Sequence, residues 1–227
     1  MGDAVETARD LKERAMLARD LEDYPEAIEI LEQAERILVE EMKPLEQSRT
    51  SGESPGDYEI SVRKQLYAIR GSKGGIYRRA GDYLASARAY DSGYEVERDF
   101  EDSYNLTQRL VSRVLERPLA AVSGDVVVEQ VAVREELGRA RQRVEEQMTG
   151  PRQKDEYAAA DLLTLSALLG SPDCRSALQR FLRLAPESSY ARQVTREVLA
   201  EVIRQARVSN QPALMLAERL EDVLAAI

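Results

Sequence analysis

Apolar residues recur at helical spacing from the start of the chain. A first stripe places them three and four positions apart, at Leu11, Ala15, Ala18 and Leu21. A second stripe has the same spacing, at Ala27, Leu31, Ala34 and Leu38. Between the two, Asp23 and Tyr24 interrupt the pattern, and Pro25 suits the first position of a new helix. Two helices joined by so short a turn are expected to pack antiparallel.

The same periodicity predicts helices along the rest of the chain. The expected ranges are 60–80, 83–99, 102–116, 125–148, 155–169, 174–184, 188–208 and 212–226. Turn-forming residues separate them, as at Gly81-Asp82 and Gly150-Pro151. The β-branched run Val126-Val127-Val128 leaves a short strand open as an alternative. We therefore expect an all-α chain of about ten helices in antiparallel pairs.

The polar stretch from Ser48 to Asp57 is the clearest loop in the sequence. It contains Ser51-Gly52 and Ser54-Pro55, both typical of turns. A flexible linker between domains is one interpretation. Because helical patterns resume at once, we expect a long surface loop inside a single domain that spans 1–227, with residues 1–47 as the first helix pair and 58–227 as the remaining pairs.

Small and aromatic residues recur at matching positions of two helix pairs. Small residues let two helices approach closely, and an aromatic residue fills the wider end. In the pair that spans 60–99, these positions are Gly74, Tyr77, Ser86, Tyr90 and Gly93. In the first pair they include Ala15, Ala27 and Ala34. This pattern favours a tetratricopeptide-like alpha-alpha superhelix, and a generic helical bundle with alanines at these positions is the alternative.

The charge of the chain limits the partners to be expected. The net charge is -9 at pH 7 and the isoelectric point is about 4.9. This argues against nucleic acid and against anionic membrane surfaces, which both favour basic proteins. The sequence has no run of ~18 apolar residues and no apolar signal region near Met1, so a cytoplasmic protein is expected.

The sequence lacks the residues that most enzymes and metal sites use. It has no histidine, which excludes Ser-His and Cys-His nucleophile pairs and most zinc sites. Its one cysteine, Cys174, is expected to be half-buried and structural, although a helix start there would lower the thiol pKa. We therefore expect no catalytic residue, no metal and no cofactor.

The segment from Arg70 to Arg79 is unusual in an acidic chain. It places four basic residues around three glycines: Arg70, Lys73, Arg78 and Arg79 around Gly71, Gly74 and Gly75. Glycines in a helix cost about 1 kcal/mol each relative to alanine, so the segment needs a compensating role. One role is close helix packing at Gly74. The other is an anion site, in which the basic side chains bind a phosphate.

Asp91 and Glu95 are four residues apart, so they share a helical face. Paired carboxylates can bind Mg²⁺ or act as acid and base, and they can equally form ion pairs with Arg78 and Arg79. Tyr104 and Asn105 complete the set of candidate ligand-binding residues.

Several segments together resemble a known family. They are Arg70 to Arg79, Ala89 to Glu95, Ser103-Tyr104-Asn105, Asp155 to Asp161 and Ala177 to Pro186. In this order they are similar to the tetratricopeptide-like TRAFs-binding region of apoptosis signal-regulating kinases and its bacterial relatives, over roughly residues 60 to 205. The resemblance implies a regulatory helical scaffold that holds adaptor proteins. It also implies a link to bacterial defence systems, in which a nucleotide-sensing role has been proposed.

Three functions follow from these observations. The first is an interaction scaffold that binds a protein partner or a peptide in a groove between helices. The second is a sensor that binds a nucleotide or another phosphorylated ligand through the Arg70–Arg79 segment. The third is an enzyme that uses Asp91 and Glu95, which the missing histidines make the weakest. The apolar stretch 214–227 is expected to pack against another helix or against a second subunit, so a homo-oligomer is a further expectation.

Overall fold

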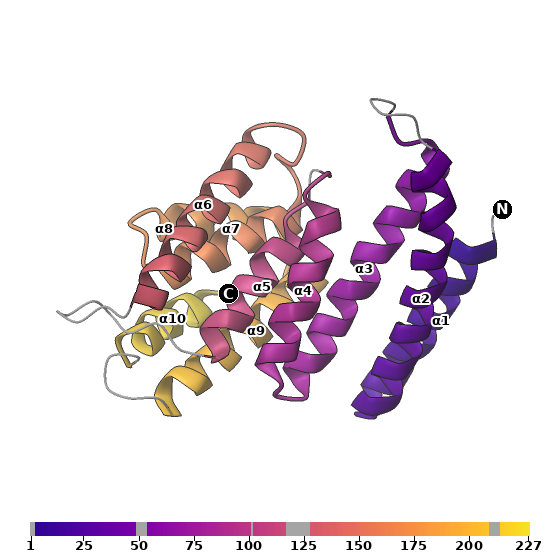
Figure 1. Ribbon diagram of the computed structural model, residues 1–227. Helices are drawn as coiled ribbons and strands as arrows, with labels where there is room; N and C mark the ends of the chain where they lie inside the picture. The colour runs from indigo at the N-terminus through magenta and orange to yellow at the C-terminus, as the bar shows by residue number, and fades with distance from the viewer. Residues whose placement is uncertain (1–2, 49–53, 101, 117–127, 209–213) are drawn as a thin grey trace. The chain divides into compact units, whose positions relative to one another are not determined.

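The computed structural model describes residues 3–48, 54–100, 102–116, 128–208 and 214–227. Within these ranges the chain forms ten helices and no strand (Figure 1). The helices are α1 (Asp3–Asp20), α2 (Tyr24–Ser48), α3 (Asp57–Arg79), α4 (Tyr83–Glu97), α5 (Tyr104–Glu116), α6 (Val128–Thr149), α7 (Glu156–Leu169), α8 (Cys174–Leu184), α9 (Tyr190–Val208) and α10 (Leu214–Ala226). The prediction of an all-α array with helix pairs packed in sequence order is confirmed.

The chain divides into two compact units, Met1–Phe100 and Glu101–Ile227. The first contains α1 to α4, and the second contains α5 to α10. The expectation that the chain acts as one domain stays a prediction. None of the helices in the described ranges combines the length and the apolar character that crossing a membrane requires.

In the first unit each helix packs against the next one (Figure 1). The turn between α1 and α2 contains Glu22 at a φ of 61°, and the carboxylate of Asp23 accepts a hydrogen bond of 3.2 Å from the Glu26 amide at the start of α2. The turn between α3 and α4 repeats this arrangement, with Gly81 at a φ of 82° and the Asp82 carboxylate accepting from the Ala85 amide at 2.9 Å. These caps explain why α2 and α4 begin where they do.

The core of the first unit is built by the periodic apolar residues of α1, α2 and α3. Ala15, Ala27 and Ala34 are completely buried, as expected for close helix contacts. Gly74 lies under the ring of Tyr90, and a Cβ atom there would come within 2.6 Å of that ring. The Ser86 hydroxyl donates a hydrogen bond of 2.8 Å to the Gly74 carbonyl. Packing between α3 and α4 thus accounts for a glycine at position 74.

The second unit has α7 as its central helix. It packs against α5, α6, α8, α9 and α10. Most of its side chains are buried, including the polar Asp161, Thr164 and Ser166. The Ser103 hydroxyl donates a hydrogen bond of 2.6 Å to the Asp161 carboxylate, and Arg152 donates one of 2.8 Å to the Ser103 oxygen. This buried network satisfies the carboxylate of α7 and connects α7 to the start of α5.

The periodicity of the sequence locates most helix ends to within a few residues. Cys174–Leu184 has the predicted bounds, while α2 continues through Pro44 to Ser48. Val128 begins α6, whereas Val126 and Val127 of the alternative strand lie outside the described residues. The C-terminal apolar stretch packs on α9 and α7 as α10, so its apolar face does not need a second subunit to cover it. A homo-oligomer stays a prediction.

Candidate anion-binding pocket

A pocket of about 340 Å³ opens in the first unit between α2, α3 and α4. We call it the anion pocket. Its lining residues are Glu35 of α2, Arg70, Lys73 and Tyr77 of α3, and Ala85, Arg88, Ala89 and Ser92 of α4. The residues of α3 and of α4 each follow spacings of three and four, so each helix presents one continuous stripe to the pocket.

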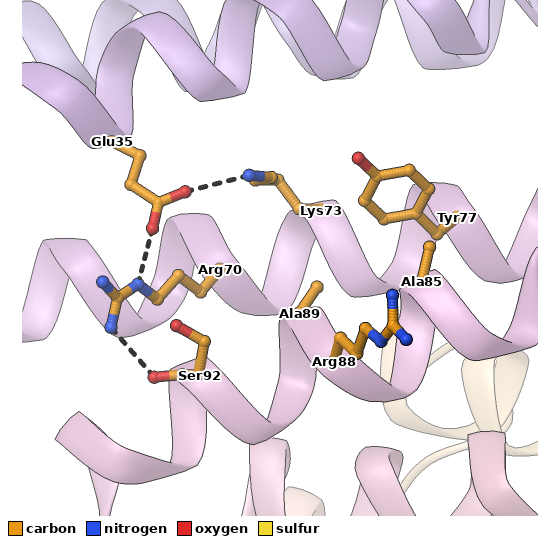
Figure 2. A pocket seen from close by; sticks show the side chains of 8 residues that line it. All are labelled: Glu35, Arg70, Lys73, Tyr77, Ala85, Arg88, Ala89 and Ser92. Carbon is orange, nitrogen blue, oxygen red and sulfur yellow. Dashed lines mark hydrogen bonds and ion pairs between the residues drawn. The ribbon is translucent and has the colours of Figure 1, made fainter.

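Glu35 bridges two cationic side chains at one end of the anion pocket. Its carboxylate accepts hydrogen bonds of 2.7 Å from Arg70 Nε and 2.9 Å from Lys73 Nζ (Figure 2). Arg70 also donates to the Ser92 carbonyl at 2.9 Å, which ties α3 to α4. Only 15–20% of each of the three charged side chains is exposed. The bridge is therefore shielded from water and stronger than a surface ion pair.

The bridge keeps Glu35 charged. Burial raises the pKa of a carboxyl group, but the hydrogen bonds and positive charges of Lys73 and Arg70 outweigh it and hold the pKa of Glu35 below its usual value. Lys73 also lies 3.8 Å from the carboxylate of Glu32, which is 43% exposed and does not line the pocket. The negative charge of the pocket lining itself is thus that of Glu35 alone.

The other end of the pocket has donors that no described residue uses. Arg88 and Tyr77 line this end, separated in the view by Ala85 (Figure 2). Within the described ranges, Arg88 has no hydrogen bond or ion pair, and the Tyr77 hydroxyl has none either. Arg88 is exposed, while Tyr77 is half-buried. Charged and polar donors around an open space are what an anionic ligand needs.

The structure brings some of the predicted ligand-binding residues together and places others elsewhere. Arg70 and Lys73 line the anion pocket. Arg78 is buried, with 4% of its surface exposed, and Arg79 is exposed; neither lines the pocket, and both interact with other residues of the chain. The basic segment is therefore divided between two sides of α3.

The carboxylates and the α5 residues also lie outside the pocket lining. Asp91 is half-buried and has an interaction partner, and Glu95 is exposed. Tyr104 and Asn105 belong to the second unit, where Asn105 is completely buried and Tyr104 is 39% exposed. Of the residues expected to pack in the repeats, Gly93 is buried and Tyr77 lines the pocket.

Reasoning from the sequence missed both charged lining residues outside α3, Glu35 and Arg88, and the small lining residues Ala85, Ala89 and Ser92 of α4. Glu35 lies in another helix pair, 35 residues before Arg70, so the basic segment gave no indication of it. Arg88 carried a usable signal, because its spacing from Ala85 and Ser92 puts it on the face of α4 that turns to α3. The sequence of α4 alone does not show that this face lines a pocket, because that depends on which residues of α3 pack beside it.

Cys174 is half-buried at the start of α8. Burial raises the pKa of its thiol, and the nearby Arg219 lowers it by a smaller amount. The helix start therefore does not make the thiol acidic, and the structure gives Cys174 the environment of an unreactive cysteine.

The sequence matches no protein-family model, and no curated protein matches it significantly. The resemblance to the TRAFs-binding region of apoptosis signal-regulating kinases stays a prediction from the residues that suggested it. Because no relative indicates a ligand, the class of ligand that fits the anion pocket is inferred from the side chains that line it.

Proposed function

We propose that this chain is a cytoplasmic interaction scaffold whose first unit binds an anionic segment of a protein partner in the anion pocket. One observation carries the proposal. In a chain with a net charge of -9, the pocket is lined by three cationic side chains (Arg70, Lys73 and Arg88) and by one carboxylate. The tetratricopeptide-like repeat positions and the resemblance to an adaptor-binding region support the same function.

The local charge decides what enters such a pocket. At physiological ionic strength, charges are screened over a Debye length of about 8 Å. A ligand inside the pocket therefore interacts mainly with the lining side chains rather than with the net charge of the chain. An acidic peptide approaching other parts of this acidic surface is repelled. Specific binding of an acidic peptide would therefore indicate that the peptide binds in the anion pocket and not elsewhere on the surface.

Fluorescence anisotropy with two labelled peptides of equal length tests the proposal. One is rich in glutamate, and the other is rich in lysine. The glutamate peptide is expected to bind the wild type, and Arg88→Glu is expected to weaken that binding by roughly tenfold or more. The control is Arg14→Glu, because Arg14 is an exposed arginine of α1 outside the pocket and the substitution changes the net charge equally.

Two results would reject this function. If Arg14→Glu weakens binding as much as Arg88→Glu, the interaction reflects net charge and not the pocket. If only the lysine peptide binds, the acidic surface dominates and the pocket takes no anionic segment.

A second candidate is a sensor of a free phosphorylated ligand. The cavity volume of about 340 Å³ favours it, because small-molecule sites span about 300–1,000 Å³. A thermal-shift screen with nucleotides tests it. A ligand present at 100 times its dissociation constant is expected to stabilise the chain by about 2.7 kcal/mol, and Arg88→Ala is expected to abolish the shift.

Both candidates assign binding and no catalysis. The third function, an enzyme that uses Asp91 and Glu95, gains no support from their positions. Asp91 has a partner within the chain, Glu95 is exposed, and neither residue lines the pocket.

A further inference from the structure

We propose that the group bound by the anion pocket is a phosphate monoester in its dianionic form. The inference rests on the proposed function, since it names the chemical class of the ligand at the same site. The shared chemistry is a terminal phosphate, carried either by a phosphorylated segment of a protein or by a free nucleotide.

The charge of the lining matches a dianion. Arg70, Lys73 and Arg88 contribute three positive charges and Glu35 contributes one negative charge, so the lining has an excess of two positive charges. A phosphate monoester carries about −1.5 to −2 charges at pH 7. A carboxylate carries only one negative charge, so it would leave one of the two excess positive charges of the lining uncompensated.

Glu35 determines which donors remain for the ligand. It holds Arg70 through Nε and Lys73 through one hydrogen bond, so both cations are fixed at one end of the pocket. An ammonium group has three N–H donors, and one of them is directed to Glu35. The others are not bound by Glu35, and the next carboxylate, that of the half-exposed Glu32, lies 3.8 Å from Lys73 Nζ. Glu35 is in this sense a positioning residue that prevents the two flexible cations from turning to solvent.

The free donors outnumber what a carboxylate can accept. They are the guanidinium of Arg88 and the hydroxyl of Tyr77, which have no partner in the described ranges, and the N–H groups of Lys73 that Glu35 does not bind, near which only the half-exposed Glu32 carboxylate lies, at 3.8 Å. A phosphate has three strong acceptor oxygens besides the ester oxygen, and an Arg guanidinium can bind two of them at once. Three donor groups therefore match three oxygens.

Two alanines leave room for the phosphate. Ala89 lies between the Arg70–Ser92 end and the Arg88–Tyr77 end of the pocket, and Ala85 lies between Arg88 and Tyr77 (Figure 2). Their methyl groups are the smallest side chains after glycine, so the volume of about 340 Å³ stays open beside α4. A larger residue at position 89 would fill the space between the cations.

Titration of the full chain with three labelled peptides tests the inference. The peptides contain phosphoserine, aspartate or serine at one position between glycines and are otherwise identical. The phosphoserine peptide is expected to bind at least roughly tenfold more tightly than the aspartate peptide, because it makes additional charge-assisted hydrogen bonds. Inorganic phosphate is expected to compete with it. Adenosine monophosphate, measured separately, represents the free phosphate monoester.

Variants connect the binding to the pocket. Arg88→Gln and Ala89→Leu are each expected to weaken phosphoserine binding by about tenfold or more, the first through lost charge and the second through lost space. Arg14→Gln is the matched control and is expected to leave binding unchanged. Circular dichroism checks that each variant remains helical, which is expected of Arg88→Gln because Arg88 is exposed and has no partner in the described ranges.

The outcomes separate the two proposals. Equal binding of the aspartate and phosphoserine peptides overturns the phosphate inference and leaves the scaffold function intact. Binding of adenosine monophosphate without binding of any peptide supports the phosphate inference and overturns the scaffold function. Binding of none of the probes overturns both.

Discussion

At the scale of single residues, Glu35 affects both the stability and the charge of the anion pocket. Its pKa lies below the usual value of 4.5, because hydrogen bonds from Lys73 and Arg70 outweigh the effect of burial. A depressed pKa in the folded state contributes stability that is present above the unfolded pKa. This stability is lost as the pH falls through the folded pKa. The charged groups that bind Glu35 are Arg70 and Lys73 on α3, while Glu32 on its own helix lies beside Lys73 and Arg88 of α4 lines the other end of the pocket.

We predict that Glu35→Gln lowers the free energy of unfolding by about 1–2 kcal/mol at neutral pH, because two charge-assisted hydrogen bonds are weakened. The difference between the variant and the wild type is expected to shrink as the pH falls through the pKa of Glu35 in the folded state, which lies below its usual value, because the wild-type carboxyl group then becomes protonated as well. Urea unfolding at a series of pH values measures it. Glu29→Gln is the control, because Glu29 is exposed on the same helix. A difference that does not change with pH would show that the bridge is not formed.

Gly74 is a residue at which close packing of two helices leaves no space for a side chain. Alanine there would gain about 1 kcal/mol of helix propensity, but its Cβ would come within 2.6 Å of the Tyr90 ring, which is completely buried. Overpacking of this kind costs about 1–3 kcal/mol. We predict a net loss of stability for Gly74→Ala, measured as a lower urea midpoint.

Gly138 provides the matched control for Gly74. It lies inside α6, and apart from its chain neighbours and the backbone of its own helix turn no heavy atom of the described residues lies within 4 Å of the position that its Cβ would take. Gly138→Ala is therefore expected to stabilise the chain by about 0.5–1 kcal/mol. If both substitutions stabilised the chain, the contact between α3 and α4 would be looser than the structure has it.

At the scale of helices, arginines in the second unit bind the carbonyl ends of their neighbours. Arg180 donates to the Met148 carbonyl near the end of α6 at 2.6 Å. Arg192 donates to the Ala185 carbonyl after α8 at 2.7 Å. Arg219 donates to the carbonyls of Ala167 and Leu168 at the end of α7, both at 3.1 Å. The last carbonyls of a helix lack partners within the helix, and a cation there also favours the helix dipole.

We predict that Arg219→Met lowers the free energy of unfolding by about 1–3 kcal/mol, because the α7 carbonyls lose charge-assisted hydrogen bonds in a half-buried place. Methionine keeps most of the apolar stem, so the change isolates the polar contribution. Arg204→Met is the control, since Arg204 is 65% exposed and its ion pair with Glu201 is long at 3.9 Å. An equal effect of both substitutions in urea unfolding would argue against a capping role for Arg219.

The helices could be predicted from the sequence far better than the pocket could. Apolar spacing and turn residues are local, so α8 and the turn at Gly81-Asp82 were predicted directly. The pocket depends on which face of α4 meets α3 and on a carboxylate from α2. Arg78 illustrates the difficulty, because the charge of an arginine favours an exposed position and yet this side chain is buried, unlike that of the adjacent Arg79. Such a position follows from tertiary packing and not from local pattern.

At the scale of the whole molecule, the division into two units has a direct consequence. The hydrophobic core of the first unit is formed by residues between Val5 and Ile76, with Val96 packed against it, so all of its members lie within Met1–Phe100. The anion pocket also lies within this unit. A segment of 100 residues is long enough to bury a core of its own, although with a smaller buried fraction than a larger domain has.

We predict that residues 1–100 fold as an isolated fragment. Its urea unfolding, followed by circular dichroism, is expected to be one cooperative transition with a slope of about 1–3 kcal/mol per molar. A fragment of residues 1–81 is the matched control. It lacks α4, so Gly74 loses the Tyr90 ring that covers it and the Ser86 hydroxyl that binds its carbonyl. Cooperative unfolding is expected to disappear in this shorter fragment, because α3 then exposes the face that α4 covers. If the 1–100 fragment also unfolded without cooperativity, the first unit would depend on the rest of the chain, and the single domain expected from the sequence would be the better description.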